Sequence, residues 1–257
     1  DDGMRYRLLE SMRAYAQEKL AATGEAAAAQ DRHLACFVRL AEEAEPLLFS
    51  AQQVAWLDTM ATEHNNLRAA LDWAVARGDA HAALRLVTAQ RSFWYTRGHY
   101  DEGRRRTLEA LAMPAAQERS AARASALNAA AALLWASGDA GAALPLLDEA
   151  LTIARERGDP WNTGWALLHL GTIVYRQGDY PAARPLLEDG LASCRAAGPA
   201  GRRGVGWGLI FLGDLALESG DPEHAGVCFA ESVDLLRELS DFGLLAYPLG
   251  RLAHLAL

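Results

Sequence analysis

Apolar residues recur three and four positions apart along most of the chain, which is the spacing of one face of an α-helix. The pattern predicts helices over about residues 10–22, 26–44, 52–60, 63–77, 80–97, 100–112, 117–137, 140–157, 162–177, 180–197, 204–219, 222–239 and 242–257. Only the segment from Arg5 to Leu9 alternates between polar and apolar residues as a short strand does. One strand is not stable alone, so we expect its partners to lie upstream of the chain.

A short phrase returns at a fixed interval and divides the helices into pairs. Its glycines are Gly98, Gly138, Gly178 and Gly220, which are 40, 40 and 42 residues apart, and the last three are followed by aspartate. A constant period of this length is typical of solenoids, in which each unit buries its apolar face on its neighbours. The last helix has no visible mate, so we expect it either to cap the solenoid or to be followed by more chain.

Small residues mark where the two helices of a pair approach each other. They lie seven positions before and five positions after the turn glycine, as Gly171 and Ala183 do around Gly178. Helices come close only where side chains are small, so we expect these positions to form the seam of each pair. The turn glycine is expected to take a positive φ and end one helix, and the following aspartate to cap the next.

Composition restricts the range of possible compartments and partners. The chain has 257 residues, of which 51% are apolar, and a net charge of −8. That charge disfavours a dedicated nucleic-acid surface, which needs clustered cations, and we expect Arg104–Arg106 and Arg202–Arg203 to be solvated helix faces. No apolar run reaches the ~18 residues of a membrane span and no signal peptide is visible, so we expect a cytoplasmic protein without a membrane partner.

Candidate chemistry is sparse. The cysteines Cys36, Cys194 and Cys228 show no CxxC spacing, so we expect small core residues rather than a zinc site or a disulfide framework. No HExxH pair occurs, and His64 is expected to be a polar residue at a helix start. The glycine-rich run 204–208 follows no strand, so we expect a flexible helix start rather than a dinucleotide loop. These observations predict no enzyme, no metal and no cofactor.

The best copy of the repeat resembles a known family. The pattern small-x-x-aromatic/aliphatic-x-x-x-Gly-Asp-Tyr-x-x-Ala, which runs from Gly171 to Ala183, resembles the tetratricopeptide repeat (TPR). The period departs from the 34 residues of that family, and about six extra residues shared between two helices would lengthen each by close to one turn. The resemblance implies an all-α, right-handed α-solenoid of TPR-like helix pairs with a period of about 40 residues.

In tetratricopeptide repeats the first helix of each pair lines the concave face, so offsets from the turn glycine select the residues of a binding groove. Aromatic side chains beside Arg, Asp and Asn suit such a surface for recognition. The predicted groove residues are Arg85, Ser92, Tyr95, Asn128, Trp135, Trp165, Leu168, Thr172, Tyr175, Arg176, Trp207, Ile210, Asp214, Glu218, Tyr247, Arg251 and His254. The alternative for the tryptophans is that they pack between adjacent repeats.

The N-terminal part resembles a second family. The segments Arg-Tyr-Arg-Leu-Leu-Glu-Ser-Met-Arg-Ala-Tyr-Ala at 5–16 and Glu-His-Asn-Asn-Leu-Arg-Ala-Ala-Leu at 63–71 look like the junction in large bacterial signal-transduction ATPases. These are NB-ARC (STAND-type) regulators related to the SARP and LuxR-type transcription factors, and the likeness covers residues 4–112. It implies that 1–24 ends a winged-helix domain with its last wing strand and helix. It further implies that 25–78 is a helical linker and that 79–257 forms the TPR-like repeats.

These observations predict a non-enzymatic sensor or protein-interaction arm of a bacterial transcriptional regulator. A protein, peptide or small-molecule effector would bind in the concave groove and change how the arm packs on the upstream ATPase and winged-helix modules. The nucleotide-binding parts would lie upstream, because this chain has no Gly-x-x-x-x-Gly-Lys-Ser/Thr loop, and the fragment itself would not contact nucleic acid. Two alternatives stay open: a free-standing TPR adaptor that binds a peptide partner, and an enzyme that uses the groove as its active site.

Overall fold

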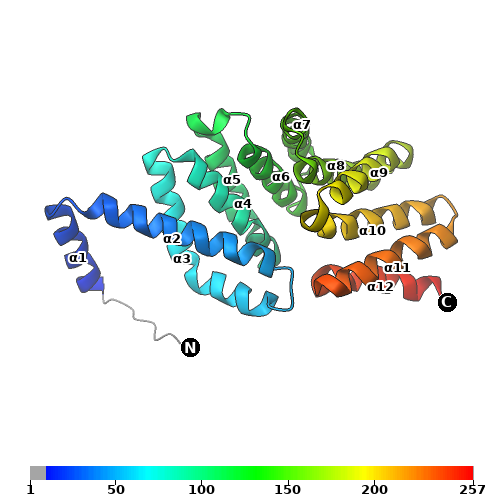
Figure 1. Ribbon diagram of the computed structural model, residues 1–257, viewed down its shortest axis with the longest axis horizontal. Helices are drawn as coiled ribbons and strands as arrows, with labels where there is room; N and C mark the ends of the chain where they lie inside the picture. Colours follow the sequence, from blue (N-terminus) through cyan, green and yellow to red (C-terminus); the bar gives the residue numbers. More distant parts are fainter. Residues whose placement is uncertain (1–9, 257) are drawn as a thin grey trace.

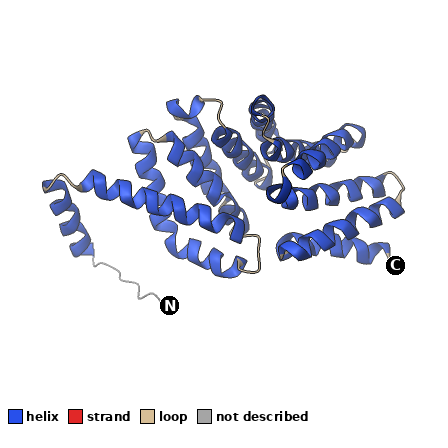
Figure 2. Ribbon diagram, viewed as in Figure 1, coloured by secondary structure: helices blue, strands red, loops and turns tan. Residues whose placement is uncertain are grey.

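The computed structural model describes residues 10–256, and every regular element in that range is helical (Figure 2). The elements are α1 (Glu10–Ala22), α2 (Ala26–Leu47), α3 (Gln53–Arg77), α4 (Ala80–Thr96), α5 (Tyr100–Ala112), η1 (Pro114–Gln117), α6 (Ala121–Ala136), α7 (Ala140–Arg157), α8 (Pro160–Arg176), α9 (Tyr180–Ala196), η2 (Gly198–Gly201), α10 (Arg202–Glu218), α11 (Pro222–Leu239) and α12 (Phe242–Leu255). The all-helical prediction is confirmed over these residues, whereas the predicted strand lies outside them.

The helices stack as consecutive pairs to form an α-solenoid. The pairs are α2–α3, α4–α5, α6–α7, α8–α9 and α10–α11, and α12 packs on α11 at the C-terminal end. Figure 1 shows the stack curving, so that the corner between α2 and α3 lies close to the corner between α11 and α12. The first helix of each pair from α4 onward lies on the inner side of this curve, where the candidate site is found (Figure 1).

Turn glycines and aspartate caps set the lengths of the helices. The four glycines of the repeated phrase have φ between 73° and 88°, which only glycine adopts without strain. Gly78, Gly158 and Gly198 have the same conformation, so the sharp turns recur at about half the repeat period. At six helix starts the preceding aspartate accepts a hydrogen bond from the third backbone N–H that follows it. Both predictions for the turn are therefore confirmed.

The small residues form the seam between paired helices, as predicted. A Cβ added to Gly171 would lie 2.7 Å from Leu187, and one added to Gly213 would lie 2.6 Å from the ring of Phe229. Ala183, five positions after its turn glycine, is fully buried. These contacts let the two helices of a pair approach closely, which buries the large apolar side chains between them and in turn fixes the spacing of successive pairs.

The segment before the first turn glycine differs from the prediction. Two helices were expected over 52–60 and 63–77, but α3 runs through both because no glycine or proline interrupts the chain between them. His64 consequently lies inside a helix, with its ring centroid 5.2 Å from that of Phe93, and not at a helix start. Its side chain is 13% exposed and lies 3.4 Å from Glu102.

Two further expectations need correction. The glycine-rich run 204–208 is not a flexible helix start, because it lies inside α10 and packs tightly: a Cβ on Gly204 would meet the sulfur of Cys194 at 2.4 Å. Cys194 and Cys228 are buried as expected, but Cys36 is exposed on α2. The glycines at 204–208 therefore serve close packing between α9, α10 and α11.

The predicted division into three domains stays a prediction. The helix expected at the end of a winged-helix domain is α1, and its strand falls outside the described residues. Helices α2 and α3 share one buried apolar cluster with α4, α5 and α6, so they continue the stack of the repeats. None of the described helices combines the length and the apolar character that a membrane crossing requires.

Candidate binding pocket

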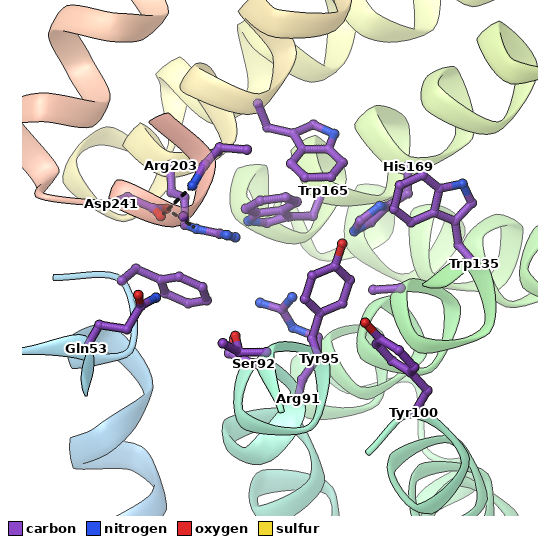
Figure 3. Close-up of a pocket in the computed structure, with 16 residues that line it drawn as sticks. Gln53, Arg91, Ser92, Tyr95, Tyr100, Trp135, Trp165, His169, Arg203 and Asp241 are labelled. Atoms are coloured by element: carbon purple, nitrogen blue, oxygen red, sulfur yellow. Dashed lines mark hydrogen bonds and ion pairs between the residues drawn. The ribbon is translucent and has the colours of Figure 1, made fainter. Parts of the chain in front are cut away.

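A pocket at the centre of the curve takes residues from both ends of the solenoid (Figure 3). It encloses about 360 Å³. Phe49 and Gln53 reach it from the α2–α3 corner, whereas Asp241 and Leu244 reach it from the start of α12. The remaining lining residues come from α4, α5, α6, α8 and α10. The pocket is therefore a product of the curvature of the whole molecule.

Aromatic side chains form the upper wall of the pocket as drawn in Figure 3. The ring centroid of Trp207 lies 6.1 Å from that of Trp135 and 6.4 Å from that of Trp165, so that side chains of α6, α8 and α10 meet. The indole N–H of Trp207 donates to the hydroxyl of Thr172 at 3.3 Å, which fixes the ring. Such rigid aromatic surfaces bind ligands at low entropic cost.

Arg203 bridges the two ends of the solenoid. Its Nε donates to the carboxylate of Asp241 at 2.8 Å, and its guanidinium lies 3.7 Å from the ring centroid of Phe49. Burial lowers the pKa of Arg203, while Asp241 acts in the opposite direction. The expectation that Arg203 belongs to a solvated helix face is therefore wrong, because its side chain is turned into the pocket and is only 22% exposed.

Arg91 is a second arginine in the pocket wall, and it has no direct counter-ion. Within the described residues its guanidinium forms no hydrogen bond and no ion pair. Burial, followed by the positive charge of Arg203, lowers the pKa of Arg91 to about 10, although Glu45 attracts the cation from a greater distance. Arg91 therefore presents unsatisfied N–H donors to the pocket.

Two polar side chains complete the wall next to the arginines. Burial, together with the charges of Arg91 and Arg203, lowers the pKa of His169 to about 3, so its imidazole is neutral at physiological pH. Its ring stacks on Trp165 with centroids 5.6 Å apart. Ser92 is only 2% exposed, and its hydroxyl has no hydrogen-bond partner among the described residues.

The structure brings five of the predicted groove residues into this pocket: Ser92, Tyr95, Trp135, Trp165 and Trp207. A separate polar cluster nearer the C-terminus surrounds Asp214, which is 1% exposed. Its carboxylate accepts from the Tyr247 hydroxyl and from Arg251 Nε, each at 2.7 Å. Tyr175 and Glu218 lie near this cluster. Burial, followed by the negative charges of Asp214 and Glu218, raises the pKa of Tyr175 to about 12.

The other predicted groove residues lie elsewhere. Leu168 and Ile210 are core residues, and buried Asn128 donates to the side chain and backbone oxygens of Asn162. Thr172 is buried beneath Trp207, whereas Arg85 pairs with Glu42 on α2 at 2.6 Å. Arg176 and His254 are exposed outside the pocket.

The misplacement of Leu168 has a simple geometric cause. Leu168, Ile210 and Asn128 each lie ten positions before a turn glycine, and in all three repeats that residue is buried between helices. For Gly178 the residue nine positions before the glycine is His169, and this residue lines the pocket. One residue turns a helix position by about 100°, so this small error moves a side chain from the groove into the core.

Arg91 was missed although the sequence carries a signal for it. It stands seven positions before Gly98, where the other repeats have Ala131, Gly171 and Gly213 at the seam. An arginine at a position that otherwise holds a small buried residue is unusual and points to a special environment. The other missed residues, including Phe49, Gln53, His169, Arg203 and Asp241, carry no comparable signal.

The arrangement as a whole defines a class of fold: a helical-repeat solenoid with an aromatic and basic pocket at the centre of its curve. No group of three or more potential metal ligands is present among the described residues. Comparison with known proteins agrees with the fold, because the model of the tetratricopeptide repeat matches residues 122–196. That segment contains α6 to α9, the most regular part of the stack.

Three relatives with longer chains contain a segment that is similar to this chain. Three mycobacterial proteins, one from Mycobacterium bovis and two from strains of Mycobacterium tuberculosis, are each 34% identical over 163 residues. They are provisionally named HTH-type transcriptional regulators. The match covers 61% of this chain but only 18% of each relative, so the chain corresponds to a small part of those proteins.

A solved structure supports the architecture alone. The crystal structure of BtubC (BKLC) from P. vanneervenii superposes with a TM-score of 0.51 and 17% sequence identity. The superposition covers 83% of this chain and 93% of that one. Such a distant likeness establishes a shared helical-repeat fold and says nothing about a shared ligand.

Proposed function

We propose that this chain is the non-enzymatic sensor arm of a bacterial transcriptional regulator. An effector binds in the pocket at the centre of the solenoid and thereby controls the ATPase and winged-helix modules upstream. The observation that carries the proposal is the pocket itself, whose wall combines residues of the first and last helix pairs. A ligand that contacts both ends favours one curvature of the stack, and a change of curvature can alter how the stack packs on a neighbouring domain.

The comparisons support the regulatory part of the proposal. Proteins that are 34% identical to this chain over 163 residues are provisionally named HTH-type transcriptional regulators. The tetratricopeptide match supports a role in binding rather than in catalysis. The tetratricopeptide match lies within residues 79–257, which we propose to be the arm, and we propose the cytoplasm as the compartment in which such a regulator acts.

The proposal is tested by substituting one pocket residue in the complete natural gene. Trp207→Ala removes an aromatic wall of the pocket, and Trp73→Ala is the matched control because Trp73 lies on α3 outside it. We expect Trp207→Ala to change transcription of the regulated genes, measured by RNA sequencing at equal protein abundance, and Trp73→Ala to leave it unchanged. Identical transcription profiles for both variants and the wild type would reject a sensor role for the pocket.

A free-standing adaptor that binds a peptide is the second candidate, and the tetratricopeptide match favours it as well. The two candidates differ in what the gene encodes before Asp1. A phosphate-binding Gly-x-x-x-x-Gly-Lys-Ser/Thr loop upstream supports the regulator. An adaptor would instead retain its peptide partner in pull-down experiments and leave transcription unaffected by Trp207→Ala.

A further inference from the structure

We propose that the pocket binds a small organic carboxylate with an aromatic or apolar body, and that Arg91 holds the carboxylate. The inference rests on the proposed function in one respect, namely that the pocket binds a ligand. It adds the chemical class of that ligand. Four observations carry it: the unpaired guanidinium, the charges around it, the aromatic wall and the size of the cavity.

The first observation is the state of Arg91. A guanidinium carries five N–H donors in a planar fork that matches the two oxygens of a carboxylate. Elsewhere in the described chain most arginines pair with a carboxylate. Arg68, for example, donates from two nitrogens to the two carboxylate oxygens of Glu102. Arg91 has no such partner, although it lines the pocket and is only partly exposed. A half-buried cation without an acceptor is costly, so a ligand anion would supply the acceptor that the described residues do not.

The second observation is the balance of the surrounding charges. The lining residues that can carry charge are Arg91, Arg203, His169 and Asp241. Asp241 is already engaged by Arg203 and by the backbone N–H of Leu244. His169 is neutral, and Glu45, whose charge attracts Arg91, does not line the pocket. The charge that an incoming ligand meets directly and unpaired is therefore positive.

The third observation concerns the rest of the ligand. Trp135, Trp165 and Trp207 with Tyr95 and Tyr100 provide flat apolar surfaces around the cavity (Figure 3). Aromatic walls alone would also suit a quaternary ammonium group, but two nearby arginines repel a cation. The buried Ser92 hydroxyl adds a polar group without a partner close to Arg91 in the wall. The combination selects an anion with an aromatic or apolar body.

The fourth observation is the cavity volume of about 360 Å³. This value lies at the small end of the range for pockets that enclose small molecules, roughly 300–1,000 Å³. A compact acid with one or two rings fits such a space. A longer chain would have to leave the cavity along the groove.

The test uses matched probes that differ only in charge. Phenylacetate and indole-3-acetate are compared with phenylacetamide and indole-3-acetamide, and benzyltrimethylammonium serves as the cationic probe. Binding is measured by calorimetry, and by the fluorescence of the pocket tryptophans. We expect each acid to bind at least about tenfold more tightly than its amide, as a charge-assisted pair predicts, and the cation not to bind. Equal binding of acid and amide, or tighter binding of the cation, would overturn the inference.

Variants assign the effect to one residue. Arg91→Met keeps an unbranched apolar side chain but removes the charge, whereas Arg184→Met removes a half-buried arginine on α9 that lies outside the pocket. We expect Arg91→Met to abolish the preference for the acid while amide binding persists, and Arg184→Met to behave as the wild type. A preference that survives in Arg91→Met would overturn the role of Arg91. Circular dichroism and the melting temperature show that both variants are folded.

A further probe separates a small acid from a chain terminus. A hexapeptide that ends in tryptophan is compared with N-acetyltryptophan, and both present the same carboxylate and ring. Tighter binding of the peptide would reject a small molecule as the natural ligand. If no probe binds but Trp207→Ala still changes transcription, the carboxylate inference fails while the sensor role stands. If the acids bind but Trp207→Ala leaves transcription unchanged, the carboxylate inference stands and the sensor role fails.

Discussion

Arg91 holds a positive charge where the described residues supply no hydrogen-bond acceptor. Its pKa of about 10 means that the surroundings disfavour the cation by an amount on the order of 3 kcal/mol. Removing the charge loses the attraction to Glu45 but also removes the repulsion from Arg203. We expect Arg91→Met to raise the free energy of unfolding by about 1 kcal/mol and the melting temperature by about 2–4 °C, both measured without ligand.

Differential scanning calorimetry at neutral pH measures this change. The control is Arg184→Met, which removes an arginine in a weak surface ion pair with Glu188 and is expected to change the unfolding free energy by less than about 0.5 kcal/mol. A lower melting temperature for Arg91→Met would mean that the native protein stabilises this cation. The residue could then not be regarded as a group kept for a ligand at the expense of stability.

His169 makes a second prediction at the scale of one residue, because its pKa is lowered to about 3 by burial and by the two pocket arginines. The unfolded chain binds a proton near pH 6.5 and the folded chain does not, so stability falls as the pH falls below that value. From about pH 7.5 to about pH 5 this histidine alone should remove about 2 kcal/mol of unfolding free energy.

Urea denaturation of wild type and His169→Gln at both pH values checks this titration. Glutamine does not titrate, so the difference in unfolding free energy between the two proteins should change by about 2 kcal/mol in favour of the variant at low pH. His64, whose pKa burial also lowers, is present in both proteins and cancels. A difference that stays constant with pH would mean that His169 is protonated in the folded state.

At the scale of the helix pair, the seam glycines decide how closely helices approach. A Cβ on Gly213 would lie 2.6 Å from the ring of Phe229, which is fully buried and cannot move away. We expect Gly213→Ala to destabilise the protein by about 1–3 kcal/mol through overpacking. Gly226→Ala on α11 is the matched control, because the nearest atom to its Cβ is 4.0 Å away.

Chemical denaturation should therefore show changes of opposite sign in the unfolding free energies of the two variants. The unfolding free energy of the control variant should rise by up to about 1 kcal/mol, since alanine has the higher helix propensity and its Cβ makes no close contact. If Gly213→Ala were as stable as the control, close contact between α10 and α11 would not be what requires glycine at the seam. The pair would then tolerate a wider spacing than the structure has.

The local sequence pattern was sufficient to predict the elements and insufficient to predict the pocket. Helix bounds, turn glycines and the seam follow from spacing, because they depend on residues within one repeat. Errors occurred where nothing marks a boundary, as in α3, and where a single step along a helix moves a side chain from groove to core, as at Leu168. The pocket joins Phe49 to Asp241, and that contact depends on small rotations summed over all the repeats.

At the scale of the whole molecule, the contact between the two ends of the solenoid is thin. Repeats touch mainly their neighbours, so the curvature of a solenoid is set by many weak restraints and is easily changed. Across the groove, the side chain of Arg203 on α10 meets Phe49 from the α2–α3 corner at 3.7 Å, beside the bond from Arg203 to Asp241. This contact restrains the curve at the site where the proposed effector binds.

We therefore expect Phe49→Ala to open the curve. Small-angle X-ray scattering should show an increase in the radius of gyration on the order of 1 Å, with unchanged helix content by circular dichroism. Phe37→Ala is the control, because Phe37 on α2 packs against the apolar core and lies outside the pocket. It should lower stability and leave the radius of gyration of the folded protein unchanged. If Phe49→Ala scatters as the wild type does, the curvature is fixed by contacts between adjacent pairs. A ligand in the pocket would then need to act by some means other than a change of curvature.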